Sequence, residues 1–519
     1  MRARMKVRLV LPTAALAAAL AFAGCGGGSS SAPDPATMMP ASAPVYIEAD
    51  LSPDGEVSAD LSALARNVFG VDDLGELIVT EVNDAASDSD EPFDYERDVA
   101  PWLGDTAGLM LSGYDGDDFQ GGSFVVPSTD TAATQAYIDK FAGGDGASAE
   151  DGSYEGVEYR VDPDDDEVYG VVGDFFVFSQ DEPGFKSVVD ASNGESLAEQ
   201  EEFAEATGAL PSGSVADVYA HIGALMEESG EELDEDERTF LEISDLDYEE
   251  STLIASVVPR ADRVEVEFST DISGKKPFGG DASKALAALP ASSLAALSSS
   301  EFGKRIGTGF DRLDAKGDDE IAPNELGEIY KEQFGVDVDQ LTDSIGEAGA
   351  FIEGSSEETV TGALVLDMKS ASEAANTVAN VGLLLRSTGV EGFSAFDGEA
   401  SGFSVRNADL GPQPLVVLTK DKRLVVGYGK ATTEAALAGD GAALGESPLF
   451  KEAVAALGEM PIVAYADGPR ALRLAASDLS DDDEFKEAEP YLEKIAYLAL
   501  GSVPEGDRTA AKLIVGFGK

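Results

Sequence analysis

An internal repetition constrains the fold of this 519-residue chain more than any other feature of its sequence. The tripeptide Gly-Glu-Ser stands at 194–196 and again at 445–447, and in both places a Phe, a helix-like stretch and an apolar run follow. Phe450 lies 247 residues after Phe203, which is close to the 251-residue spacing of the tripeptides. Solenoid repeats are far shorter, at about 20 to 50 residues. The repetition therefore predicts two homologous domains, each with its own core.

Each copy has strands in runs and no regular alternation of strand and helix. Residues 155–161 and 168–178 alternate between apolar and polar side chains, as half-buried antiparallel strands do. We therefore predict an α+β fold in which each domain has a largely antiparallel sheet with packed helices. The predicted boundaries are a signal peptide at 1–24, a flexible Gly/Ser/Pro tether at 25–42, a first domain at 43–272, a linker at 273–284 and a second domain at 285–519.

The first 25 residues have the layout of a bacterial secretion signal. Four basic residues precede an apolar run from Val10 to Phe22, which is short for a transmembrane helix. Ala23 and Gly24 then precede Cys25, an arrangement that resembles the lipobox of bacterial lipoproteins, whose usual form has Leu in place of Phe22. We expect Cys25 to be lipidated and to anchor the protein to the cell membrane on its extracytoplasmic face. The alternative is an ordinary signal peptide with an incidental cysteine.

The charge of the chain limits its partners. It has 100 acidic and 35 basic residues, a formal net charge of −65. Such a charge repels nucleic acids and anionic lipid surfaces, and it favours solubility, cation accumulation or adaptation to a salty setting. The apolar fraction of 43% is high enough for real cores. Because Cys25 is the only cysteine, no internal disulfide can form and the fold depends on those cores.

A motif in the first copy gives a resemblance to a known family. Residues 98–104 read Asp-Val-Ala-Pro-Trp-Leu-Gly, and residues 43–50 read Ala-Pro-Val-Tyr-Ile-Glu-Ala-Asp. Together with the Gly-Glu-Ser segment, they resemble an uncharacterised family of bacterial lipoproteins that carry a domain of unknown function, mostly from high-GC Gram-positive and related bacteria. The resemblance covers residues 43–272 and extends more weakly into the second copy. It implies location and architecture, and no catalytic residues.

Trp102, the only tryptophan, is a candidate for contact with a ligand. Pro101 before it fixes the backbone and favours a turn or the start of a strand. A tryptophan in such a place most often fills a core, and stacking on a ligand is the alternative.

One acidic segment has the spacing of a calcium-binding loop. Asp314, Asp318 and Glu325 occupy its positions 1, 5 and 12, which supply oxygen ligands in such loops. However, Lys316 stands where an oxygen ligand is expected, and Asp319 replaces the glycine of the sharp turn. A plain acidic helix–turn–helix is therefore the favoured interpretation, and a calcium site is the alternative.

The sequence contains no recognisable catalytic set. His221 is the only histidine, and no Gly-rich phosphate loop, nucleophile elbow or zinc-binding His motif is present. We therefore expect no enzyme activity, no cofactor and no metal. The leading hypothesis is a lipid-anchored binding protein for an apolar envelope ligand or a partner protein. The alternatives are a structural or interaction lipoprotein of the envelope and an unrecognised hydrolase.

Overall fold

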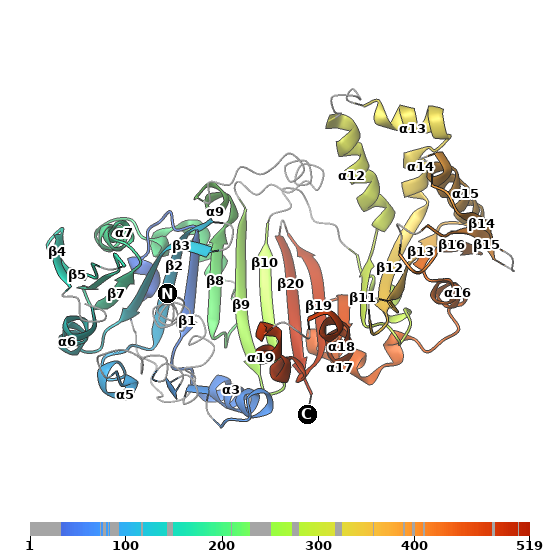
Figure 1. Ribbon diagram of the computed structural model, residues 1–519. Coiled ribbons are helices and arrows are strands. Elements are labelled where there is room, and N and C mark those ends of the chain that lie inside the picture. Colours follow the sequence, from blue (N-terminus) through green and yellow to red (C-terminus); the bar gives the residue numbers. More distant parts are fainter. Residues whose placement is uncertain are drawn as a thin grey trace. The chain divides into compact units, whose positions relative to one another are not determined.

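The computed structural model describes two compact units, residues 33–271 and residues 280–518 (Figure 1). Within residues 33–518, the residues that it does not describe are 73, 76–78, 81–82, 84–92, 116–117, 143–148, 164, 209, 229–250, 272–279, 317–323, 357, 388–389, 397–399, 408–410, 480–482 and 507. Cys25 and the rest of the leader lie outside the described residues.

The first unit has a sheet whose described strands are all paired antiparallel, in the order β4-β5-β6-β7-β3-β2-β1-β8-β9-β10. These strands are β1 (Val45–Asp50), β2 (Thr106–Asp115), β3 (Asp118–Pro127), β4 (Glu150–Tyr154), β5 (Val157–Val161), β6 (Val168–Val172), β7 (Phe175–Ser179), β8 (Ala216–His221), β9 (Thr252–Arg260) and β10 (Arg263–Thr270). Short turns join many neighbours, such as β9 and β10, because antiparallel strands need no crossover helix.

Apolar layers cover both faces of this sheet. Tyr46 and Tyr219 face one layer, and Phe176 and Val257 face the other. The helices are η1 (Pro35–Met38), α3 (Gly55–Val68), α5 (Tyr95–Asp98), α6 (Thr131–Phe141), α7 (Glu182–Asn193), η2 (Leu197–Glu199), α8 (Glu201–Thr207) and α9 (Ile222–Glu228). Residues of η1, α7, η2 and α8 pack in the first layer, while residues of α6 and α3 pack on the opposite face.

The second unit repeats the same plan, with described strands in the order β14-β15-β16-β17-β13-β12-β11-β18-β19-β20. They are β11 (Ala295–Ser299), β12 (Ile345–Glu353), β13 (Thr361–Met368), β14 (Phe393–Ala395), β15 (Ser401–Val405), β16 (Leu415–Lys420), β17 (Arg423–Tyr428), β18 (Ile462–Asp467), β19 (Ile495–Glu505) and β20 (Arg508–Phe517).

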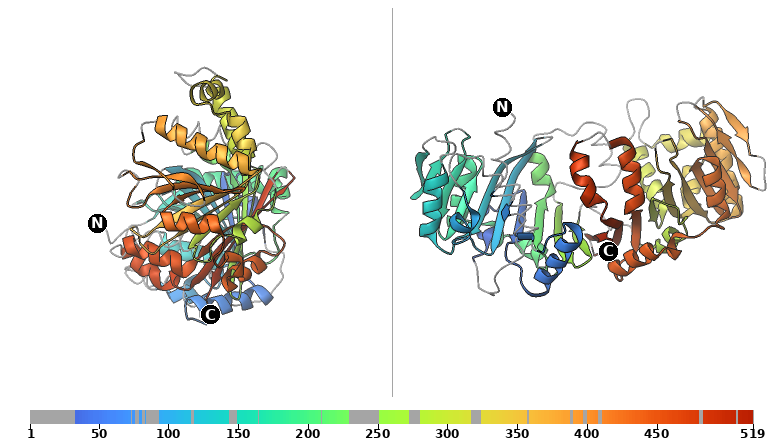
Figure 2. Two further views of the ribbon diagram at one scale, coloured as in Figure 1. Left: turned by 90° about the vertical axis from the view of Figure 1, so that its right-hand side faces the viewer. Right: turned by 60° about the horizontal axis from the view of Figure 1, so that its bottom comes forward.

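Helices also pack against this second sheet, as both views in Figure 2 show. They are α11 (Ser283–Ala287), α12 (Phe302–Lys316), α13 (Leu326–Phe334), α14 (Val338–Asp343), α15 (Ala371–Ser387), α16 (Lys430–Ala438), η4 (Leu444–Glu446), α17 (Pro448–Leu457), α18 (Gly468–Leu479) and α19 (Asp483–Leu492). Residues of α11, α16, η4 and α17 share a core with Phe351 and Tyr465, and α15 covers Phe403 and Leu424 on the other face. The mixed helix and antiparallel sheet confirm the predicted α+β class.

Equivalent aromatic pairs support the correspondence of the two units. The rings of Phe203 and Tyr219 are 5.2 Å apart in the first unit, and those of Phe450 and Tyr465 are 5.3 Å apart in the second. Both pairs join the helix after the 3-10 turn to the eighth strand of their sheet. The contact fixes that helix on the sheet, because edge-to-face rings of this kind attract beyond simple burial.

The structure places the two Gly-Glu-Ser tripeptides out of register with each other. Ser196 forms an isolated β-bridge with Pro40, and Ala443 forms the matching bridge with Pro290. The 3-10 turns η2 and η4 begin directly after these bridges. Ser196 therefore corresponds to Ala443 and not to Ser447, so part of the sequence similarity that first indicated the repetition is coincidental.

The folded body begins earlier than the predicted boundary at residue 43. Within the predicted tether, 25–42, η1 is capped by Asp34, and Ala36 and Met39 are fully buried. The apolar side chains of this segment pack in the core. The sequence of the segment predicted a flexible tether because it is rich in Gly, Ser and Pro. Similarly, α11 begins at Ser283, inside the predicted linker. Among the described residues, no helix is both long and apolar enough to cross a membrane.

Candidate ligand-binding site

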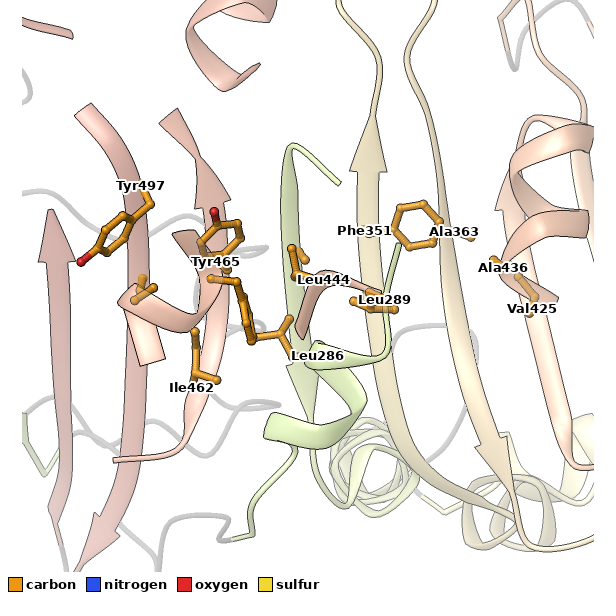
Figure 3. Packing of buried hydrophobic residues seen from close by; sticks show 14 of the residues in the cluster. Leu286, Leu289, Phe351, Ala363, Val425, Ala436, Leu444, Ile462, Tyr465 and Tyr497 are labelled. Carbon is orange, nitrogen blue, oxygen red and sulfur yellow. The ribbon is translucent and has the colours of Figure 1, made fainter. Parts of the chain in front are cut away.

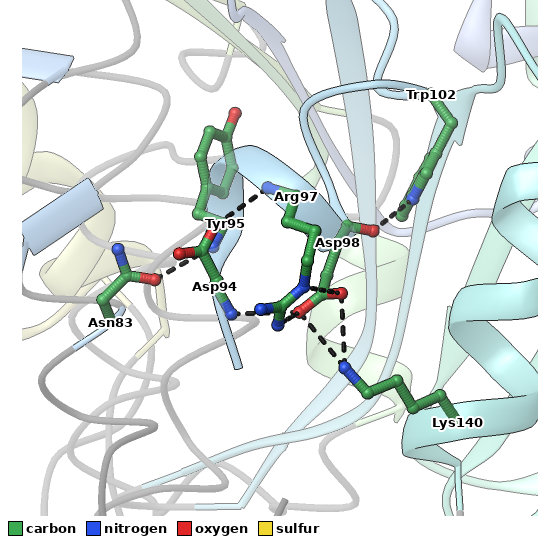
Figure 4. A network of polar contacts seen from close by, with 7 residues as sticks. All are labelled: Asn83, Asp94, Tyr95, Arg97, Asp98, Trp102 and Lys140. Carbon is green, nitrogen blue, oxygen red and sulfur yellow. Dashed lines mark hydrogen bonds and ion pairs between the residues drawn. The ribbon is translucent and has the colours of Figure 1, made fainter. Parts of the chain in front are cut away.

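Trp102 is a core residue in this structure. Its side chain is 2% exposed, and its ring lies 5.4 Å from that of Tyr137 and 5.2 Å from that of Phe176. The indole Nε1 donates a hydrogen bond of 2.7 Å to the backbone oxygen of Asp98 (Figure 4). A ligand could stack on this ring only after the aromatic cluster had opened.

The other residues of the Asp-x-x-Pro-Trp-Leu-Gly motif are also occupied by structural contacts. The Asp98 carboxylate accepts hydrogen bonds from Arg97 Nε at 2.9 Å, the Asp94 backbone at 3.0 Å and Lys140 Nζ at 3.3 Å (Figure 4). The bond from Arg97 contributes most to lowering the pKa of Asp98 to about 2. A Cβ atom at Gly104 would lie 2.5 Å from the Pro127 carbonyl oxygen. The motif thus fixes a turn against the sheet.

The predicted calcium ligands do not converge in the described residues. Both oxygens of Asp314 accept backbone hydrogen bonds at the start of α13, from Leu326 at 2.7 Å and Gly327 at 3.3 Å. Glu325 is exposed, and Asp318 lies outside the described residues. Within the part of the chain that the structure describes, no group of three or more His, Cys, Asp or Glu side chains could hold a metal ion.

His221 lies at the end of β8, where it caps a helix. Its Nδ1 accepts a hydrogen bond of 3.0 Å from the backbone of Ala224, in the first turn of α9. This contact gives the imidazole a structural role at the start of α9.

Two half-buried carboxylates that the sequence did not single out lie opposite each other on β1 and β8. Glu48 and Asp217 are cross-strand partners, and burial is the main cause that raises the pKa of each. Tyr46 donates to Glu48 at 2.7 Å, while Ser256 and Ser214 donate to Asp217 at 2.5 and 2.9 Å. These bonds occupy three of the four carboxylate oxygens, so the pair is built into the sheet.

A pocket of about 560 Å³ lies in the second unit between the sheet and helices α11 and α16. Its walls include Ala285 of α11, Ala435 of α16 and residues 439–443, while Gly349 and Val365 contribute from the sheet. Figure 3 shows core residues that border this region, including Leu289 and Ala436. Alanines and glycines therefore form much of the walls, together with charged and larger apolar side chains.

The corresponding place in the first unit is filled. If the bridges at Pro40 and Pro290 are matched, Pro35 and Met38 of η1 correspond to Ala285 of α11 and to Ala288, the residue directly after that helix. A Cβ atom at Gly108 of β2 would lie only 2.7 Å from the Pro35 side chain, so the packing there is tight. Helix α7 is also three residues longer than α16, with twelve residues against nine. The pocket thus results from smaller side chains and a shorter helix.

Charged side chains of both signs surround the pocket. They are Lys284, Glu347, Asp367, Arg423 and Asp440. Arg423 is half-buried, and its Nη1 donates to the Ala436 carbonyl oxygen at 3.4 Å, at the C-terminal turn of α16. The other four are exposed. A lining that combines small apolar side chains with charges of both signs suits an amphipathic molecule. Sequence reasoning missed this site because alanines and scattered charges carry no motif.

Comparisons with known proteins give a family but no activity. No curated protein matches the chain. Two solved structures, crystal forms I and III of TP0453, match at 9% and 10% identity with a TM-score of 0.25 each, over 48% of this chain and 82% and 84% of theirs. A TM-score this low carries no argument about fold or function. Residues 7–510 match the family described as protein of unknown function (DUF3352), in agreement with the predicted domain of unknown function. The chain therefore belongs to the DUF3352 family.

Proposed function

We propose that this protein is a lipid-anchored, extracytoplasmic and non-enzymatic binding protein whose second unit holds an amphipathic small molecule. The observation that carries the proposal is the alanine-walled pocket of about 560 Å³ between the sheet and α11 and α16. Its volume lies within the range of about 300 to 1,000 Å³ that is usual for small-molecule sites. Each buried methylene of an aliphatic ligand would contribute about 0.8 kcal/mol to binding.

The anchor is proposed from the leader, where small residues precede the single cysteine, Cys25. One acyl chain gives only reversible binding to a membrane, whereas two or three chains make it durable. A net charge of −65 would hold the body away from an anionic lipid surface while the anchor retains it there. The pocket would then meet envelope molecules without the protein lying flat on the membrane.

The two units are proposed to be homologous domains that arose by duplication. The identical order of strand pairings and the matching Phe–Tyr contacts support common descent. Under this proposal one copy kept a filled core while the other acquired a pocket at the same place.

A pocket-filling variant tests the binding proposal. Ala435 is exposed on α16 and lines the pocket, so Ala435→Trp places an indole in the space of the ligand. We expect residues 26–519 to bind dodecylphosphocholine below its micelle concentration, and Ala435→Trp to bind it at least about tenfold more weakly, equivalent to about 1.4 kcal/mol. Isothermal titration calorimetry gives both affinities.

Ala438→Trp is the matched control for this variant. Ala438 is exposed on the same helix and does not line the pocket, so its replacement should leave the affinity unchanged. Equal affinity in the wild type and Ala435→Trp would refute the assignment of the pocket. An extract of the purified full-length protein that contained no lipid beyond its own anchor would also count against it. Capture of an envelope protein instead would favour the interaction-lipoprotein alternative.

A further inference from the structure

A second hollow lies on the opposite face of the sheet in the second unit. It has a volume of about 350 Å³, and every residue that lines it is Ala, Leu, Ile, Phe or Tyr, from strands β11, β12, β18, β19 and β20. Leu297 and Ile352 point into solvent here, with exposed fractions of 55% and 42%. Large apolar side chains grouped on a soluble surface are uncommon and mark a binding surface.

The first unit covers the same face with helices. There, Leu61 and Ala65 of α3 pack on Val215 and Val257 beside β8 and β9. In the second unit, α12 occupies the same position in the chain order as α3, between the first and second strands. It packs against α14 and β12, where Gly303 allows close approach to the Thr342 carbonyl. Among the described residues, none that lines the hollow belongs to a helix, although α18 packs elsewhere on β18 and β19.

The chemistry of the hollow excludes most classes of ligand. Strands β11, β18 and β19 are each paired on both edges, so their backbone groups are already hydrogen-bonded to neighbouring strands. No lining residue is charged. A peptide, sugar or nucleotide would therefore lose hydrogen bonds to water and gain none in return. A second copy of a chain with net charge −65 would meet electrostatic repulsion.

We propose that this hollow binds the aliphatic chain of a lipid, as a second site independent of the pocket between the sheet and α11 and α16. Hydrocarbon is the chemistry that gains from burial against Leu297 and Ile352 without needing a polar partner. Binding here depends on apolar contact alone, so salt should not weaken it.

The test uses 1,6-diphenylhexatriene, an uncharged hydrocarbon whose fluorescence rises in an apolar site, with residues 26–519. Leu297→Glu places a carboxylate in the hollow and should weaken binding of the dye at least tenfold. Leu383→Glu is the matched control, because Leu383 is exposed to 53% on α15 in the same unit and does not line the hollow. It should leave the affinity unchanged. Ile352→Glu repeats the test at a second lining position, and circular dichroism verifies that each variant is folded.

The outcomes separate this inference from the proposed function. Loss of dye binding in Leu297→Glu and Ile352→Glu, with binding retained in Ala435→Trp, supports the second site. Loss of dye binding in Ala435→Trp alone would overturn the second site and leave the proposed function standing. Unchanged dye binding in both Glu variants would overturn it as well. The second site would also be overturned if sedimentation showed a dimer in the wild type and a monomer in Leu297→Glu, since this face would then bind another copy of the chain.

Discussion

At the scale of single residues, Asp98 connects the sequence motif to the fold. Its backbone oxygen holds the Trp102 indole, and its carboxylate, with a side chain 10% exposed, gathers Arg97 and Lys140. Because those bonds favour the ionised form, the pKa of Asp98 falls to about 2. A carboxylate with a lowered folded pKa stabilises the protein above its unfolded value, which is about 3.9. That stability is lost as the pH falls from about 4 through about 2.

Replacing this carboxylate tests its role. Asp98→Asn should lower the free energy of unfolding at pH 7 by about 1 kcal/mol, a value kept small because Arg97 is 56% exposed and water screens the pair. The difference from wild type should shrink as the pH falls from about 4 to about 2, where wild-type Asp98 also becomes neutral. Urea unfolding across this range measures it, with exposed Asp174→Asn as control. A difference that did not change with pH would contradict the electrostatic account.

The structural roles of some residues could be predicted from the sequence, and those of others could not. The single Trp102 could be expected in a core, because a large amphipathic ring after a proline-fixed turn is most often buried. The pairing of Glu48 with Asp217 could not be foreseen among 100 acidic residues, since it depends on strand register. Likewise, Ala435 and Arg423 line the same pocket because of how α16, which ends at Ala438, packs beside β17.

At the scale of elements, the position of α12 decides whether the face beside β11 is covered. Gly303 lies against the Thr342 carbonyl oxygen of α14, and Gly307 lies near the Thr342 side chain. Small residues at this contact let the two helices approach closely, and α12 also packs against β12. The glycines therefore help to hold α12 in place against α14.

A single methyl group at this contact should disturb α12. A Cβ atom at Gly303 would overlap the Thr342 carbonyl oxygen, so Gly303→Ala should destabilise the protein by about 1 to 3 kcal/mol, as overpacking typically does. Thermal unfolding measures the loss. Gly441→Ala is the control, because a Cβ atom there has no neighbour within 4 Å. If both variants melted at the wild-type temperature, the close contact would not hold α12 in place.

Local sequence patterns predicted the strands better than they predicted the short helix η1 or the packing of helices on the sheet. The apolar–polar patterns at 155–161 and 168–178 indicated strands there. One face of β6 is buried and the other less so, as alternation predicts, whereas β7 is buried at every position. The short η1 was missed, since Gly, Ser and Pro around it are typical of a flexible segment. Which helix covers which face is set by long-range packing, and the sequence carries no periodic signal for that.

At the scale of the whole molecule, two units with the same strand pairings differ in what fills them. The first unit fills its core beside β2 with Pro35 and Met38, and the second leaves a pocket beside β12. The second unit also leaves apolar strands open on its other face. We therefore propose that the first unit is a packed body and that the second unit binds the ligand.

Photolabelling of the full-length protein in its own membranes tests that claim most directly. A lysophospholipid with a diazirine at the end of its acyl chain would be activated by light, and the labelled peptides would be identified by mass spectrometry. We predict label on residues 283–292 and 430–443, which border the pocket, and less label on these residues in Ala435→Trp, whereas label on β11 and β12 reports the second hollow. Label confined to residues 33–271 would contradict the account.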